Sequence, residues 1–211
     1  MIHRMSTYNS PEATLLRVAP MCQASYGALK RGLATADKLH RIAGWSPVPD
    51  IHLIRHMTRR DAMEDLKAFS VGDVLPDDDE NLGLAMSGLI VQLPEDTIRI
   101  WHTTESDVPA PRSEIGREFV TQSSVAPDLF EAGVLSYDAG ATAARPNSLI
   151  IQWTAQGQEI LRYDLIRPVG HKNGKVVIDW REPLLQKYQA MPDIEFRRRD
   201  GDAQSGDAED T

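Results

Sequence analysis

Apolar side chains recur every three or four positions through residues 10–69, which is the spacing of amphipathic helices. Ser10 before Pro11 is typical of a helix start, because the hydroxyl accepts a bond from a free N–H and proline fits the first turn. Pro20 and Gly32 interrupt the pattern. The sequence therefore predicts several short helices here: one that starts at Ser10 and ends before Pro20, then 22–31, 36–43, and one capped by Thr58 that ends at Phe69.

After an acidic loop at 73–81, apolar and polar residues alternate, which is typical of strands. Residues 88–93 and 97–103 flank a Pro-Glu-Asp turn and predict a hairpin. Near the end of the chain, an Asn-Gly pair at 173–174 separates two apolar runs, and this pair favours a tight hairpin turn. We expect an antiparallel three-stranded meander from the runs 149–153, 159–167 and 176–180, and short helices at 114–121, 125–132 and 182–190.

These elements predict an α+β fold with a helical N-terminal region, then an antiparallel sheet or small barrel with short helices. A polar tail follows that has almost no apolar residue, and we expect it to be disordered. The predicted organisation is a basic helical region at 1–72, an acidic and mainly antiparallel β domain at 73–192, and the tail at 193–211.

Charge is divided unevenly along the chain. Residues 1–60 contain nine Lys or Arg and three Asp or Glu, a net charge of +6, whereas the whole chain carries −8. Such asymmetry can mark an interaction surface. We therefore expect the basic head to bind a partner through these cations: Arg17, Lys30, Arg31, Lys38, Arg41, Arg55, Arg59 and Arg60.

The composition restricts the class of protein. A single cysteine excludes an intramolecular disulfide and a cysteine-rich zinc site, and it favours a reducing cytoplasm. No apolar run is long enough for a membrane span, and the first ten residues lack the apolar segment of a secretory leader. No phosphate-binding or dinucleotide-binding glycine motif is present, so we expect no cofactor.

One combination of residues is compatible with nucleophilic catalysis. Cys22 follows a proline and would lie near a helix start, where a thiol loses its proton more easily. His102 on a predicted strand would be its base, and Asp164 on another strand would orient that base. The alternative is that Cys22 is a buried apolar residue, because it shares a helical stripe with Tyr26 and Leu29.

Two further candidates concern metals and nucleic acid. His52 and His56 are four residues apart and would share a helical face, with Asp61 or Glu64 as a third metal ligand, although surface histidines are the simpler interpretation. Two helices around Gly32 suggest a helix-turn-helix, but its cations fall where that motif needs apolar residues.

The pattern as a whole favours a cytoplasmic, non-enzymatic interaction or regulatory protein whose basic head binds an acidic protein surface. Two alternatives stay open at this stage. The same head would serve a nucleic-acid-binding regulator, or Cys22 would serve a hydrolase or transferase. The cations would otherwise face the acidic part of the same chain. No membrane association is expected, and the oligomeric state is not fixed by the sequence.

Overall fold

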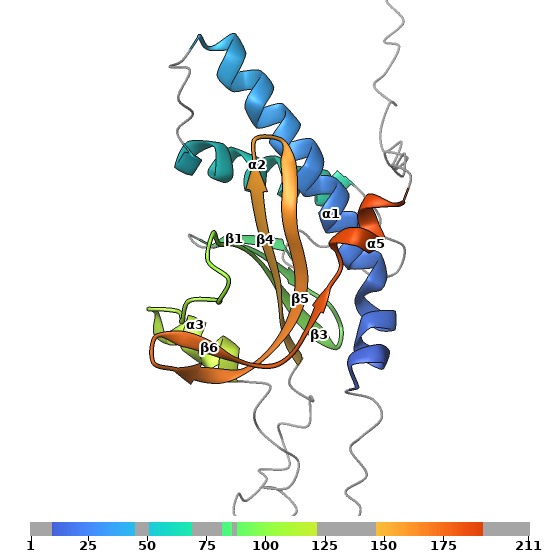
Figure 1. Ribbon diagram of the computed structural model, residues 1–211, viewed down its shortest axis with the longest axis vertical. Helices are drawn as coiled ribbons and strands as arrows, with labels where there is room; N and C mark the ends of the chain where they lie inside the picture. Colours follow the sequence, from blue (N-terminus) through green and yellow to red (C-terminus); the bar gives the residue numbers. More distant parts are fainter. Residues whose placement is uncertain (1–9, 45–50, 69–81, 86–87, 122–146, 192–211) are drawn as a thin grey trace, which may run out of the picture.

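The computed structural model describes residues 10–44, 51–68, 82–85, 88–121 and 147–191 (Figure 1). Its described parts confirm an α+β fold, with helices on a six-stranded sheet. The elements are α1 (Pro11–Ile42), α2 (Ile51–Ala68), β1 (Leu82–Ala85), β2 (Gly88–Gln92), β3 (Asp96–His102), α3 (Glu114–Thr121), β4 (Asn147–Gln156), β5 (Glu159–Lys172), β6 (Lys175–Pro183) and α5 (Leu185–Gln189).

Helix α1 is continuous over 32 residues, so the predicted interruptions at Pro20 and Gly32 are wrong. Its start is as expected, because the Ser10 hydroxyl accepts a bond from the Ala13 N–H at 3.2 Å. Pro20 is exposed on the outer side of the helix, while neighbouring turns are buried against the sheet. Burial of that apolar stripe offsets the one backbone hydrogen bond that the proline cannot donate.

Gly32 lies where α1 crosses α2 at very close range. A methyl group built on it would come within 2.6 Å of the Thr58 carbonyl oxygen. Thr58 is buried in the middle of α2 and its hydroxyl donates to the Ile54 carbonyl at 2.8 Å, so the predicted helix start at Thr58 is also wrong. Gly32 thus provides close helix packing and no turn, which removes the geometry of a helix-turn-helix at this position.

The sheet has the strand order β1-β2-β3-β4-β5-β6. Both predicted antiparallel units are confirmed: β2 pairs with β3, and β4, β5 and β6 form the meander. At the turn between β5 and β6, Asn173 and Gly174 have φ values of 52° and 74°, as an Asn-Gly hairpin turn requires.

Two expectations about the sheet need correction. The two antiparallel units join through β3 and β4, which are parallel. A long connection that includes α3 separates these strands in sequence, and a parallel pair requires such a crossover. The sheet is open, with β1 and β6 at its edges in the part of the chain that is described, so the barrel alternative is not supported.

The sheet separates two apolar clusters. The larger one lies under α1, α2 and α5, and includes Met21, Ile100, Trp153 and Tyr163. The smaller one lies on the other face, where α3 packs, and includes Ile150. The N-terminal helices therefore share a core with the sheet. The predicted boundaries near 72 and 192, the helix 125–132 and the tail 193–211 lie outside the described residues.

The two remaining helices match their predictions in position. Ser113 precedes α3, and its hydroxyl accepts from the Gly116 N–H at 3.2 Å, as a helix start at 114 requires. Helix α5 is shorter than the predicted 182–190 because β6 continues to Pro183. None of the described helices combines the length and the apolar character needed to cross a bilayer.

Candidate functional site

Cys22 lies inside the core and away from any helix start. It falls in the middle of α1 and has no exposed surface. Burial raises the pKa of its thiol to about 12. A thiol in this environment stays protonated near neutral pH and is a poor nucleophile. The position agrees with the structural alternative, in which Cys22 is a small apolar residue of the helix stripe.

The structure does not bring Cys22, His102 and Asp164 together. His102 pairs with Trp153 across the parallel strands, and Trp153 pairs with Tyr163 on β5. Trp153 and Tyr163 lie in the core cluster under the helices, and His102, two residues after Ile100 of that cluster, lies on the same face of the sheet. Asp164 follows Tyr163 along the strand, and consecutive residues of a strand point to opposite faces. Asp164 therefore lies on the far face, where its carboxylate is 3.5 Å from Arg181 Nη1.

His102 is in an environment that disfavours its charged form. Its ring meets the Trp153 ring edge-on, with centroids 4.7 Å apart. Burial, and then the nearby cation of Arg55, lower its pKa from the ordinary 6.5 to about 4. The residue is neutral at physiological pH and stabilises the packing of β3 on β4.

His52 and His56 lie on one helix, as their spacing allowed, and both are exposed on α2. Within the described residues, no group of three His, Cys, Asp or Glu side chains is arranged to hold a metal ion. The two residues are therefore surface histidines in this part of the chain.

Arg17 meets the acidic part of its own chain. Its Nε and Nη2 atoms donate to the two carboxylate oxygens of Asp96 at 2.6 and 2.8 Å. Glu95 is 3.3 Å away on the same turn. The Asp96 side chain is 1% exposed, so this pair is a buried connection between α1 and the start of β3. Arg17 thus agrees with the alternative in which the cations of the basic head face the acidic part of the same chain.

Two other head cations pair within the helices. Arg31 on α1 donates to Asp65 on α2, and Arg41 pairs with Asp37 one turn earlier on α1. These contacts neutralise cations that the sequence assigned to a partner. The remaining head residues differ in exposure: Lys30, Lys38 and Arg60 are exposed, whereas Arg55 and Arg59 are partly buried.

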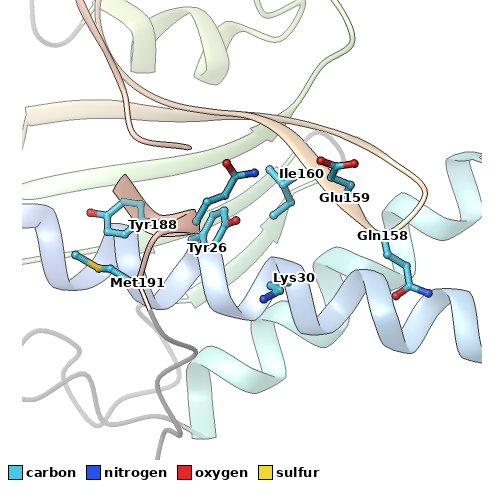
Figure 2. A pocket seen from close by; sticks show the side chains of 8 residues that line it. Tyr26, Lys30, Gln158, Glu159, Ile160, Tyr188 and Met191 are labelled. Carbon is cyan, nitrogen blue, oxygen red and sulfur yellow. The ribbon is translucent and has the colours of Figure 1, made fainter. Parts of the chain in front are cut away.

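A groove of about 350 Å³ lies between α1, the turn after β4 and α5 (Figure 2). It brings together residues far apart in the sequence. The lining consists of Tyr26, Lys30, Gln158, Glu159, Ile160, Tyr188, Gln189 and Met191. Aromatic, aliphatic and charged side chains thus share one concave surface, as is typical of binding sites.

The floor of this groove is held by a cluster of three tyrosines. The rings of Tyr26 and Tyr188 stack with centroids 6.0 Å apart, and Tyr163 meets Tyr26 edge-on at 5.2 Å. The Tyr163 hydroxyl donates to the Cys22 carbonyl at 2.7 Å, and the Tyr188 hydroxyl donates to the Ala19 carbonyl at 3.4 Å. These bonds to the backbone of α1 fix two of the rings, so the floor is ordered before any ligand arrives.

Two lysines lie near the tyrosines, one in the lining of the groove and one against the ring of Tyr188. Lys30 lines the groove from α1. The Lys187 ammonium lies 5.6 Å from the centre of the Tyr188 ring. Glu159, on the opposite wall, contributes one carboxylate. The groove therefore combines aromatic side chains with one lysine and one acidic residue, and a second lysine contacts the ring of Tyr188.

The sequence pattern indicated only part of this site. It singled out Lys30 for its charge and placed Tyr26 on the inward stripe of a helix. It missed the contribution of the β4–β5 turn and of α5, because these residues reach the groove only through the fold of the meander over α1. The sole available signal was the polar turn around Gly157, which has a φ of 58°.

No protein-family model, no curated protein and no solved structure matches this chain.

Proposed function

We propose that this chain is a non-enzymatic interaction protein that binds an acidic segment of a partner protein in the groove between α1 and α5. The observation that carries the proposal is the lining of that groove, which Lys30 shares with two stacked tyrosines. A segment with a carboxylate next to an apolar side chain fits this chemistry. The carboxylate would pair with Lys30, and the apolar side chain would cover the aromatic floor.

The site also favours binding over catalysis. The described groove residues include no histidine, cysteine or serine that would act as a nucleophile or as a base near neutral pH. Elsewhere in the described chain, Cys22 is buried with a raised pKa, and Asp164 and His102 lie on opposite faces of the sheet. These placements support a protein that works by association.

The partner would thus contact one part of the basic head, around Lys30, and not all of its cations. Among the described head cations, Lys30 lines the groove, whereas Arg17, Arg31 and Arg41 do not. Lys30 is exposed and lines a concave surface, where a bound carboxylate loses water and the attraction is stronger than on an open face.

The test places a photo-crosslinking amino acid at Gln158, on the rim of the groove, and at Glu118, an exposed residue of α3. Both proteins are irradiated in an extract of the cells that make the protein. We expect protein adducts at Gln158 that are absent at Glu118. Introducing Lys30→Glu into the Gln158 protein should abolish them, because the charge reversal repels an acidic segment.

Lys38→Glu is the matched control. It makes the same charge change on an exposed lysine of α1 that does not line the groove. It should leave the adducts intact. Equal loss with Lys38→Glu would mean that net charge, not the groove, controls binding. Adducts that disappear on nuclease treatment would instead favour a nucleic-acid partner and refute the proposal.

A further inference from the structure

Arg99 is a buried cation on the sheet face opposite the groove. It lies in β3 between Ile98 and Ile100, which point into the core under α1, so its own side chain points to the other face. The strand register places it between Ile90 on β2 and Ile150 on β4. Only 8% of its surface is exposed.

The surroundings of Arg99 are aromatic. Its guanidinium carbon lies 5.7 Å from the centre of the Trp101 ring and 5.5 Å from the centre of the Phe119 ring on α3. Both distances fall within the range of cation–π attraction. Neither contact provides a hydrogen-bond acceptor, and the buried Nε atom has none among the described residues.

Comparison with Arg17 shows what Arg99 lacks. Arg17 is also largely buried, and a carboxylate of its own chain accepts two of its N–H groups. Among the described residues, none places a carboxylate oxygen within 4.0 Å of the Arg99 guanidinium. A buried charge without a counter-ion is costly, and burial lowers the pKa of this guanidinium.

We propose that Arg99 is the recognition residue of a carboxylate-binding site on this face, with Trp101 and Phe119 holding its guanidinium in place. A carboxylate matches the fork of N–H donors in two parallel hydrogen bonds. One negative charge also balances one guanidinium. A phosphate dianion would leave an extra charge in apolar surroundings that include Ile150 and Ile166. This site is independent of the groove, because the sheet separates the two.

The test follows the Nε–H signal of Arg99 by NMR in the full-length, ¹⁵N-labelled protein. Sodium butyrate is added as the probe, with sodium chloride and sodium phosphate at matched ionic strength as comparisons. We expect a saturable downfield shift of the Arg99 signal with butyrate. The Nε–H signal of Arg17, which already has its carboxylate, should stay in place.

Arg99→Lys and Arg17→Lys each remove one Nε–H signal and so assign it. If a variant does not fold, through-bond correlation to the backbone of the wild type assigns the signals instead. An Arg99 signal that does not move with butyrate, or moves equally with chloride, would overturn the proposal. A larger response to phosphate than to butyrate would overturn the carboxylate class. As a second readout, butyrate should raise the melting temperature of the wild type and leave that of Arg99→Gln unchanged.

Discussion

The contact between Gly32 and Thr58 yields a prediction about Gly32→Ala. In an exposed helix interior this substitution stabilises by about 1 kcal/mol, because alanine has the higher helix propensity. Here the new methyl group would come within 2.6 Å of the Thr58 carbonyl oxygen and 3.3 Å of its carbonyl carbon. These are backbone atoms in the middle of α2, so relief requires the two helices to separate.

The size of the effect follows from these two opposing terms. Overpacking a tight contact costs about 1–3 kcal/mol, and a clash with the backbone belongs at the upper end of that range. Subtracting the helix propensity gain of about 1 kcal/mol leaves a net destabilisation of about 2 kcal/mol. The sign is therefore opposite to the one that propensity alone predicts.

Urea unfolding followed by circular dichroism measures this difference in unfolding free energy, provided that the dependence of that free energy on urea concentration, the slope m, is the same for both proteins. Ala34→Gly, at an exposed position of the same helix, calibrates the propensity term and should cost about 1 kcal/mol. If the urea midpoint of Gly32→Ala equals or exceeds that of the wild type, α1 and α2 do not pack at this distance. The description of α1 as one continuous helix packed closely on α2 would then be wrong.

Three other predictions concern the buried polar groups. Arg17→Met should lower the free energy of unfolding by about 3–5 kcal/mol, because it leaves the Asp96 carboxylate buried without its arginine partner. Arg41→Met, at an exposed pair, should change the free energy of unfolding by less than about 0.5 kcal/mol. Similar losses for the two variants in thermal or urea unfolding would contradict this prediction. The Cys22 thiol, with its pKa of about 12, should react with a thiol reagent only as fast as the protein unfolds, and rapid labelling of the native state would disprove its burial. Because the pKa of His102 is lower in the folded chain, this histidine binds a proton at higher pH in the unfolded chain than in the folded one. The free energy of unfolding should therefore fall as the pH decreases from about 6.5 to about 4. His102→Gln should remove this part of the pH dependence in urea unfolding.

Local chemistry made several elements predictable. Asn173 and Gly174 define the turn between β5 and β6, because few other residue pairs adopt positive φ at two adjacent positions. Ser10 and Ser113 mark helix starts because each hydroxyl satisfies an N–H group that the helix leaves unpaired. In these cases the deciding interactions lie within a few residues of each other.

The same local rules failed at Pro20, Gly32 and Thr58. Each of these residues often ends or starts a helix, yet each lies inside one here. Burial of a long apolar stripe against the sheet outweighs the lost hydrogen bond at Pro20, and contact with α2 uses the small size of Gly32. The residues that neighbour these positions in the sequence do not indicate which helix or sheet surface the apolar side of the helix will pack against.

The candidate sites divide in the same way. The sequence indicated that Lys30 carries an exposed charge, and it placed Arg99 on an alternating strand. It did not indicate that Tyr188 would lie beside Tyr26, or that Arg99 would be buried against Phe119 without a carboxylate.

By itself, the sequence determined the type of most elements, the antiparallel meander and the uneven charge, since these depend on periodicity, turn residues and composition. Only the tertiary structure decided which cations are neutralised, which strands pair in parallel and which side chains form the groove. The physical reason is that burial and charge pairing depend on distances between residues far apart in the chain, and those distances exist only once the helices have packed on the sheet.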